Sequence, residues 1–409
     1  MVLVVLDTVR ADHTSLCGYS RPTTPTLEAL AERGSCTCGA VSPGAWTLPS
    51  HASYFTGKPV LEHQADFAEG GGFRTSQLAA AIRPLDGRWP TLAEQLQRRG
   101  YQTFGVSANP VLSLGSGLQR GFDRFLSCRP GPKCPGSPMN RRVLGLLDEA
   151  RTDRPLFLFV NYIDAHWNWS AVHAGVEWVP PTPAFGALES PALANQFLSG
   201  SLRGQHARSF LQRRRDLYDW GVFLADQSLG QLLGELERRG WFSAGYRLVV
   251  ASDHGELLGE HGLLDHGRSL HEANNRVPVC IVDTRGPQTP LGSSVSALVV
   301  HDLVLGEPPG AYPIESVAFP RTDASGPAGN ELWTAQWEGS VKTMQHGAVV
   351  ESYDVDADPG ELHPTTPASD RSGRQRVGEL ARQASELYRR EGGTSPELLE
   401  DLRALGYVK

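Results

Sequence analysis

The stretch RLVVASDHG at residues 247–255 decides the fold prediction. Its apolar run predicts a buried strand, and Asp253 and His254 follow directly where that strand would end. The same pattern occurs at VLVVLD, where Asp7 ends the first apolar run of the chain. Because ligands of α/β proteins gather where the strands of a parallel sheet end, we expect these side chains to converge at one edge.

Strand-like apolar runs alternate with helical patterns over most of the chain. We predict strands at 2–6, 101–108, 155–163, 247–251 and 277–283, and helices at 24–34, 91–100 and 218–240. Such alternation predicts an α/β fold in which helices sandwich a mostly parallel central sheet. We assign residues 1–310 to this α/β domain. Asp164 and His166 follow the strand predicted at 155–163, so they are expected at the same edge.

The pattern changes after residue 310. LWTAQWEGSVKTMQ at 332–345 and AVVESYDV at 348–355 are typical of short antiparallel strands, and a polar helix is predicted near 370–390. We therefore expect residues 311–409 to form a small C-terminal α+β subdomain with a tail helix.

Charge and hydropathy exclude two classes of partner. The formal net charge of −7 is spread over 409 residues with no basic cluster, so we expect no nucleic-acid polymer as a partner. The first apolar run meets Asp7 almost at once and follows no basic leader, and no stretch approaches the roughly 20 apolar residues of a membrane span. We therefore expect a cytoplasmic protein without membrane contact.

The six cysteines lack the paired spacing of a zinc site. Cys36 and Cys38 are separated by a single residue, and we expect reduced thiols throughout. The alternative is one disulfide between Cys128 and Cys134, across a loop rich in proline and glycine.

GAWTLPSHAS at residues 44–53 places Thr47 where a helix would begin, because Pro49 suits the first turn. A hydroxyl at that place meets free backbone N–H groups and the positive end of the helix, which stabilise an alkoxide and bind anions such as phosphate. The alternative is an ordinary threonine N-cap. Asp7 and Asp253 carry the same ambiguity, since a strand-end aspartate often caps the next helix.

Four motifs in order resemble the sulfatase-like branch of the alkaline phosphatase superfamily, over residues 2 to about 363. They are VVLDTVRADH at 4–13, SPGAWTLPSHASYFTGK at 42–58, VVASDHGELLGEHG at 249–262 and ESYDVDADPGELH at 351–363, and LLEDLRALGYV at 398–408 is similar to the usual tail. The resemblance implies a mixed, largely parallel sheet between helices, with a small antiparallel subdomain after it. It also implies that Thr47 occupies the place of the nucleophile.

The chain departs from the sulfatase pattern at this nucleophile. Sulfatases carry a cysteine there, matured to formylglycine within Cys-x-Pro-Ser-Arg, whereas the window here reads Thr47-Leu48-Pro49-Ser50-His51. A threonine cannot yield the formylglycine aldehyde. Hydrolysis of sulfate esters through its gem-diol is therefore excluded.

Three further departures surround the expected site. Asp7 is followed by Thr8 instead of a second acid, Asn109 stands near the place of a sulfate-binding lysine, and His266 replaces a later lysine. The resemblance therefore implies a rebuilt site, in which Asn109 and His51 are candidates to bind the substrate. Arg268 is a further candidate, for a charged part of the substrate, and the alternative is that it faces solvent.

The resemblance implies a divalent metal ion held by Asp7, Thr47, Asp253 and His254. Ca2+ prefers an all-oxygen shell while Zn2+ and Mn2+ accept an imidazole, so we expect zinc or manganese before calcium. We expect one ion rather than two. Ligands for a second ion would come from Asp164, His166, His266, His301 or His346.

Taken together, the residues and the resemblance predict a metal-dependent hydrolase of phosphodiesters or phosphonate esters. Thr47 would form a covalent phospho-enzyme, with His266 and His166 at the phosphoryl oxygens or the leaving group. The alternatives are a transferase of phosphoryl groups or phospho-alcohols, a sulfate-ester hydrolase without formylglycine, and an inactive binding protein. The expected partner is a small phosphate or phosphonate ester.

Overall fold

The computed structural model describes residues 1–69, 82–112, 115–127, 136–167, 191–320, 331–365 and 371–389, with Trp169 and Trp178. Its main sheet has eight strands in the order β12-β2-β11-β8-β1-β7-β5-β6. These are β1 Val2–Leu6, β2 Ser35–Val41, β5 Gln102–Ser107, β6 Arg124–Ser127, β7 Leu156–Tyr162, β8 Arg247–Ala251, β11 Arg276–Asp283 and β12 Val295–Ser296. Strands β8, β1, β7, β5 and β6 run parallel, and β11 runs antiparallel to β8 and β2. The predicted α/β class is confirmed.

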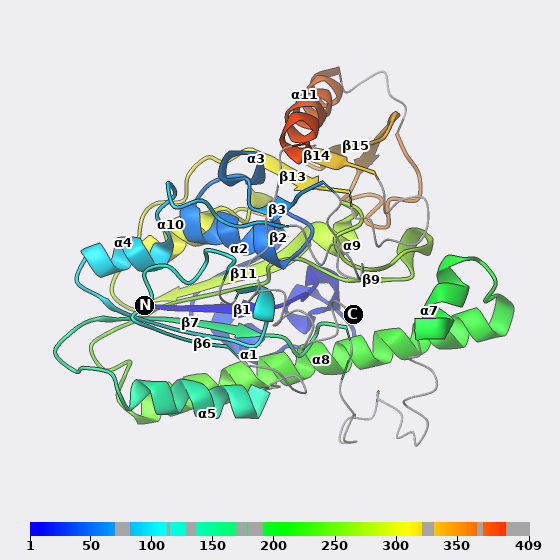
Figure 1. Ribbon diagram of the computed structural model, residues 1–409. Helices are drawn as coiled ribbons and strands as arrows, with labels where there is room; N and C mark the ends of the chain where they lie inside the picture. The colour runs from blue at the N-terminus through cyan, green and yellow to red at the C-terminus, as the bar shows by residue number, and fades with distance from the viewer. Residues whose placement is uncertain are drawn as a thin grey trace.

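Helices cover both faces of this sheet (Figure 1). One face carries α2 Thr47–Thr56, α3 Val60–His63, α4 Leu92–Arg98 and α10 Val299–Leu305, and the other carries α1 Pro25–Ala31, α5 Gly136–Leu147 and α8 Gly204–Arg238. Successive side chains of a strand point to opposite faces. Leu3 and Val5 accordingly lie in the core under α2 and α4, while Val4 and Leu6 lie in the core under α1 and α8.

Short elements complete the α/β part of the chain. They are η1 Ala11–His13, η2 Ser15–Cys17, β3 Asp66–Phe67, β4 Ile82–Arg83, η3 Pro110–Leu112, α7 Pro191–Leu198, β9 Leu257–Leu258, η4 Glu260–Gly262, β10 Leu264–Asp265 and α9 Glu272–Asn275. None of the helices in the described ranges combines the length and the apolar character that a membrane span requires.

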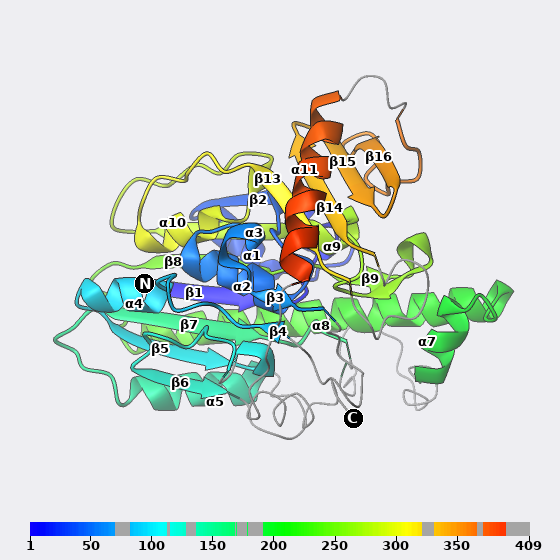
Figure 2. The ribbon, with the colours of Figure 1, turned by 45° about the horizontal axis from the view of Figure 1, so that its top comes forward.

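A second, four-stranded antiparallel sheet follows (Figure 2). It consists of β13 Ile314–Ala318, β14 Trp333–Glu338, β15 Val341–His346 and β16 Val349–Asp354. Helix α11 Arg371–Tyr388 packs against β14 and β15, and its Val377, Leu380 and Ala384 are buried. The predicted antiparallel strands and polar helix are thus present. The boundary at residue 310 stays a prediction, and the tail at 398–408 lies outside the described residues.

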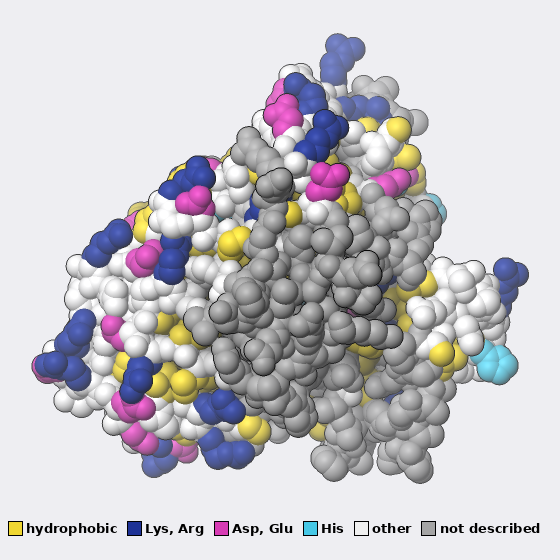
Figure 3. Space-filling model, in the orientation of Figure 1, with side chains coloured by type: hydrophobic (Ala, Val, Ile, Leu, Met, Phe, Trp, Pro, Cys, Tyr) yellow, Lys and Arg dark blue, Asp and Glu magenta, His cyan; other side chains and the backbone are white. Residues whose placement is uncertain are grey.

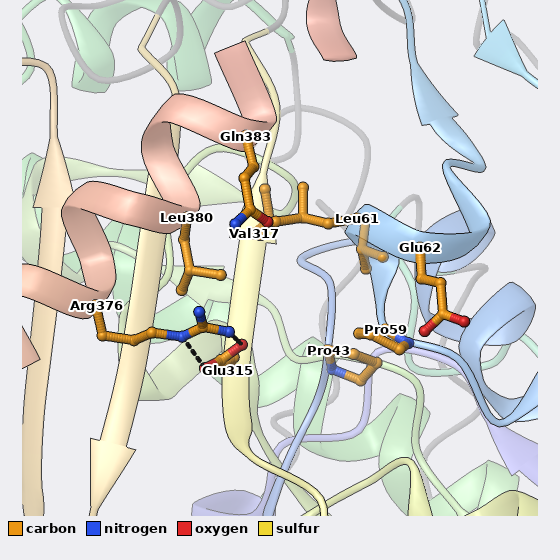
Figure 4. Close-up of a pocket in the computed structure, with 10 residues that line it drawn as sticks. Pro43, Pro59, Leu61, Glu62, Glu315, Val317, Arg376, Leu380 and Gln383 are labelled. Atoms are coloured by element: carbon orange, nitrogen blue, oxygen red, sulfur yellow. Dashed lines mark hydrogen bonds and ion pairs between the residues drawn. The ribbon is translucent and has the colours of Figure 1, made fainter. Parts of the chain in front are cut away.

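A cavity of about 340 Å3 separates α11 from α3 (Figure 4). Its wall includes Leu61, Val317 and Leu380, and Arg376 Nε donates to Glu315 Oε1 at 2.5 Å beside it. None of the site residues predicted from the sequence lines this cavity.

Basic and acidic side chains are interspersed over the face that Figure 3 shows. Exposed ion pairs of the protein include Arg99 with Glu307 and Arg124 with Glu149. That no nucleic-acid polymer binds the protein stays a prediction.

Two disulfides correct the prediction of reduced thiols. Cys17 is bonded to Cys38, and Cys36 is bonded to Cys280. Cys36 and Cys280 are register partners on the antiparallel strands β2 and β11, so the fold itself brings them together. The narrow spacing of Cys36 and Cys38 was misleading, because residues two apart on a strand share a face and each reaches a different partner. The alternative bridge between Cys128 and Cys134 lies outside the described residues.

The bond between Cys36 and Cys280 closes a loop with a sequence separation of 244. A disulfide that closes a long loop restricts the unfolded chain. The double substitution Cys36→Ala, Cys280→Ala is therefore expected to lower the free energy of unfolding by about 2–4 kcal/mol. Urea denaturation of both proteins without reductant measures the difference, and equal midpoints would contradict the expectation.

Candidate active site

Asp7 and Asp253 follow directly on two neighbouring parallel strands. β1 pairs with β8, with Val5 opposite Ala251, and each aspartate lies two residues beyond these partners. The backbone N–H of Thr8 donates to Asp253 Oδ1 at 3.1 Å, which links the two strand ends. Both carboxylates are buried. The structure thus brings together the two acids that the sequence pattern placed at one edge.

His254 is fully buried beside them. Its Nδ1 lies 2.9 Å from the carbonyl oxygen of Gly255, so Nδ1–H donates and Nε2 keeps its lone pair. Burial lowers the pKa of His254, which holds the ring neutral. Nε2 lies 3.4 Å from Thr47 Oγ1 and 3.5 Å from Asp253 Oδ2. A neutral imidazole with an oriented lone pair is the form that ligates a metal ion.

Thr47 is the first residue of α2, and its hydroxyl does not cap the helix. The N-cap is Trp46, which supplies no side-chain cap. Instead, Asn109 Nδ2 donates to Thr47 Oγ1 at 3.1 Å and to Asp7 Oδ2 at 2.8 Å. The N–H of Val111 donates to Asn109 Oδ1 at 3.0 Å and thereby fixes the orientation of the amide. The sequence singled out Asn109 for the substrate, and the structure places it between Thr47 and Asp7.

The donor set fits a divalent cation. One ligand atom each from Asp7, Asp253 and His254 lies within 4.8 Å of the other two. Asp7 Oδ1 and Asp253 Oδ2 are buried and accept no hydrogen bond from any residue in the described ranges. Burial, followed by the charge of Asp253, raises the pKa of Asp7 to about 7, and burial raises the pKa of Asp253 to about 7. Two buried carboxylates can ionise together at neutral pH only when a cation compensates them.

Thr8 lies beside these ligands, and its sequence context did not predict it as a site residue. Its backbone is in the left-handed region, with φ of 62°, which is costly for a β-branched residue. Its Oγ1 is buried and makes no hydrogen bond within the described part of the chain. Only its position after Asp7 could have pointed to it.

His51 lies behind Thr47 within α2. Its Nδ1 is 2.9 Å from the carbonyl oxygen of Thr47 and 3.4 Å from Asp253 Oδ2. Burial lowers the pKa of His51 to about 3, so the ring is neutral. These contacts make it a support for Thr47, and its predicted contact with the substrate stays a prediction.

His266 and His166 lie next to the candidate ligands. The ring centroid of His266 is 4.5 Å from that of His254 and 4.8 Å from that of His166. His266 Nδ1 lies 3.2 Å from Oε2 of Glu256, a fully buried carboxylate that the sequence analysis did not single out. The position of Glu256, two residues after His254, is the one signal in the sequence that could have identified it.

Arg268 is buried, which excludes the alternative that it simply faces solvent. Its Nη2 lies 3.7 Å from Asp265 Oδ2, and Arg214 donates to Oδ1 of the same carboxylate at 2.9 Å. Arg10 Nη2 lies 2.7 Å from Asp12 Oδ2.

The residues considered for a second ion do not form a complete set of ligands in the described part of the chain. Gly136 N donates to Asp164 Oδ1 at 3.1 Å, His301 lies in α10 against Gln95 and Asp302, and His346 lies in β15 beside Glu331. Within the described ranges, none of Asp164, His166, His266, His301 and His346 belongs to a group of three potential ligand side chains.

Metal affinity is expected to depend on pH below neutrality. Because the pKa values of Asp7 and Asp253 are raised to about 7, the ion must displace protons at lower pH. The apparent affinity for Zn2+ or Mn2+ should therefore rise from pH 5 to 7 and level off above roughly pH 8. Calorimetric titration at several pH values measures this affinity. Its repetition in buffers of different ionisation enthalpy measures the protons that the metal displaces and the buffer takes up. An apparent affinity that does not change from pH 5 to 8 would contradict the expectation.

Comparison with known proteins gives one family and several solved structures. The family model described as Sulfatase matches residues 1–304, and no curated protein matches. The structure of BT4656 in complex with its substrate D-glucosamine-2-N,6-O-disulfate is 15% identical, with a TM-score of 0.69 and coverage of 95% of this chain and 97% of that one. The phosphonate monoester hydrolase of Agrobacterium radiobacter is 17% identical, with a TM-score of 0.64 and coverage of 94% and 95%. SpPMH, the phosphonate monoester hydrolase of Silicibacter pomeroyi, is 16% identical, with a TM-score of 0.62 and coverage of 94% of both chains.

Proposed function

The chain belongs to the sulfatase family, and from this premise we propose that it is a metal-dependent hydrolase of phosphodiesters or phosphonate esters with Thr47 as nucleophile. One observation carries the proposal: Thr47 Oγ1 lies 3.4 Å from His254 Nε2, beside the paired carboxylates Asp7 and Asp253. Thr47 takes the place of the formylglycine cysteine, and its hydroxyl is a nucleophile suited to phosphorus.

The proposed reaction has two displacements at phosphorus. Thr47 Oγ1 attacks, the bond between Oγ1 and phosphorus forms, and the bond to the leaving alcohol breaks. Water then attacks the same phosphorus and releases Thr47. A divalent ion held by Asp7, Asp253 and His254 would lower the pKa of the Thr47 hydroxyl and polarise the phosphoryl group.

Residues around Thr47 support its attack. Asn109 Nδ2, at 3.1 Å from Thr47 Oγ1, donates to the oxygen as negative charge develops on it. His51 holds the backbone carbonyl of Thr47 at 2.9 Å and so fixes the first turn of α2. The N-terminus of α2 adds partial positive charge at the site of attack.

His266 is the proposed proton donor to the leaving alcohol. Imidazole titrates near neutral pH, and Glu256 at 3.2 Å orients its Nδ1–H. His166 and Arg268 are the proposed contacts to the non-bridging oxygens or to a charged part of the substrate. We propose one ion, zinc or manganese, because the donor set contains a nitrogen.

The location of the protein stays a prediction. The sequence predicts the cytoplasm, but the bonds between Cys17 and Cys38 and between Cys36 and Cys280 count against it. Disulfides are rare in cytosolic proteins and persist in oxidising compartments.

A substrate panel tests the proposed activity. The protein is loaded with Zn2+ or Mn2+ and assayed with bis-p-nitrophenyl phosphate, phenyl p-nitrophenyl phosphonate, p-nitrophenyl phosphate and p-nitrophenyl sulfate. We expect the highest kcat/KM on the diester or the phosphonate ester. A preference for the sulfate would favour direct threonine attack on sulfur. Transfer of the phosphoryl group to added glycerol would favour a transferase, and no turnover would favour a binding protein. Each of these three results overturns the proposal.

The role of His266 predicts a dependence on the leaving group. His266→Ala is expected to lower kcat/KM by about 10²–10⁴-fold for alkyl esters, whose alkoxide must be protonated as it leaves. The loss should be much smaller for p-nitrophenyl esters, because p-nitrophenolate leaves without a proton. Equal losses on both substrates would contradict the role, and His206→Ala on the exposed surface of α8 is the matched control.

A further inference from the structure

Asn161 lies near the carboxyl end of β7, between two strands that lead into the candidate active site. It pairs in register with Val5 of β1 on one side and with Ser107 of β5 on the other. Asp7 comes two residues after Val5, and Asn109 comes two residues after Ser107. Register partners, and residues two apart on a strand, share a face of the sheet. Asn161 therefore lies on the face of Val5, which packs in one core with α2, and it is fully buried there.

The orientation of the Asn161 amide is fixed by its neighbours. Its Oδ1 accepts a hydrogen bond from the backbone N–H of Asn109 at 3.2 Å and lies 3.0 Å from Ser107 Oγ. A backbone N–H can only donate, so the oxygen of the amide must face it. The Nδ2 group is thereby directed to Asp7, and it donates to Oδ2 of that carboxylate at 3.3 Å.

Asn109 is held in the same way and reaches the same oxygen. Its Oδ1 accepts from the N–H of Val111, and its Nδ2 donates to Asp7 Oδ2 at 2.8 Å. Oδ2 of Asp7 therefore accepts from two amide groups. Oδ1 is buried and accepts from no residue in the described ranges. The two asparagines thus leave a single oxygen of Asp7 for a cation.

Asp253 shows the same division between its two oxygens. Its Oδ1 accepts from the backbone N–H groups of Thr8 at 3.1 Å and His254 at 3.0 Å. Its Oδ2 is buried and accepts no hydrogen bond from the part of the chain that the structure describes. Each carboxylate therefore presents one oxygen. The donors are backbone groups at Asp253, whereas at Asp7 they are side chains that the sequence could have chosen otherwise.

A carboxylate restricted to one oxygen discriminates between metal ions. Zn2+ is usually held by four ligand atoms, and one oxygen from each acid together with an imidazole suits it. Ca2+ takes about six to eight oxygens and often uses both oxygens of a carboxylate. Two amide donors on Asp7 Oδ2 oppose that second contact, because Oδ2 would have to give up their hydrogen bonds.

A purely structural role does not explain why residue 161 is an asparagine. The bonds of its Oδ1 to Asn109 and Ser107 tie the ends of β5 and β7 together. Those bonds need only an acceptor, which an aspartate of the same shape would also supply. The bond to Asp7 is the one that needs the N–H of an amide.

We propose that Asn161, together with Asn109, restricts Asp7 to one metal-binding oxygen and so makes the site select Zn2+ over Ca2+. Asn161 is a positioning residue, because it acts through Asp7 and through the backbone of Asn109. The inference rests on the proposed function, since it concerns the ion of that site. Partners that orient metal ligands in this way commonly contribute about 10–100-fold to metal affinity.

The ratio of the affinities for Zn2+ and Ca2+ tests the proposal. Protein stripped with a chelator is titrated with each ion at one pH, in competition with a fluorescent indicator. Asn161→Ala is expected to lower the affinity for Zn2+ by about 10–100-fold without lowering that for Ca2+. Asn161→Asp keeps the acceptor for Asn109 and Ser107 but removes the donor to Asp7, so its ratio should fall as well.

Asn140→Ala is the matched control. Asn140 is also buried, and its amide bonds Tyr162 and Ser228 without contacting Asp7. Its loss should lower stability and leave the ratio of the two affinities unchanged.

The outcomes separate this inference from the proposed function. Thermal unfolding shows which variants fold, and an Asn161 variant that folds and keeps the ratio of the unchanged protein overturns the inference. Equal losses for both ions in Asn161→Ala also overturn it, because a purely structural role predicts them. If Asn161→Ala does not fold, the ratio in Asn161→Asp decides. An unchanged protein that binds no Zn2+ would overturn the metal of the proposed function, and this inference with it.

Discussion

Thr47→Ala is expected to lower kcat by on the order of 10⁴-fold or more on the best substrate, the scale seen when an enzyme loses its nucleophile. The substitution removes the only atom proposed to form a bond with phosphorus. It leaves Asp7, Asp253 and His254 in place, so the loss should come from chemistry rather than from the fold. Steady-state kinetics with the metal content measured in parallel test the expectation.

Thr47→Ser is the matched control for this prediction. It keeps the hydroxyl beside Asn109 and His254 and removes one methyl group, so it should retain a substantial part of the activity. If Thr47→Ala kept more than a tenth of the activity at equal metal content, Thr47 would not be the nucleophile.

Lys342→Met is expected to cause the largest loss of stability, about 3–5 kcal/mol in the free energy of unfolding. Lys342 is fully buried, with Nζ 2.5 Å from Glu361 Oε1 and 3.2 Å from Glu272 Oε1. Burial alone would raise the pKa of Glu361, but Lys342 and His271 lower it to about 2, so the carboxylate is charged. Removal of the lysine leaves buried charge without its partner. Urea denaturation measures the effect.

Two further variants decide whether the loss comes from the buried charge. Lys342→Met combined with Glu361→Gln should recover part of the stability, because it removes one of the charges left behind. Lys58→Met, which breaks a half-exposed pair with Glu62, should cost less than about 1 kcal/mol. Similar losses for Lys342→Met and Lys58→Met would contradict the account.

The strands and the convergence of Asp7 with Asp253 could be predicted because both depend on local patterns. Apolar runs such as 247–251 predict buried strands, and neighbouring parallel strands end at the same edge. The long helix was predicted at 218–240, yet α8 begins at Gly204, because its polar first turns carry little apolar periodicity.

Contacts between distant segments could not be predicted from the sequence. Cys36 and Cys280 pair because β2 and β11 are antiparallel neighbours, an arrangement that no local pattern encodes. Glu256 and Thr8 are marked in the sequence only by their places after His254 and Asp7, and their importance appears only when β1 and β8 lie side by side. Likewise, Glu361 reaches His271 only through the packing of the C-terminal sheet on the catalytic part.

The covalent intermediate tests the central claim most directly. The metal-loaded protein is mixed with excess phenyl p-nitrophenyl phosphonate, quenched in acid within the first turnover, digested and analysed by tandem mass spectrometry. We predict that the peptide containing Thr47 gains the mass of one phenylphosphonyl group, on Thr47 itself. An unmodified Thr47 during burst release of p-nitrophenol, or the adduct on another residue, would contradict the account.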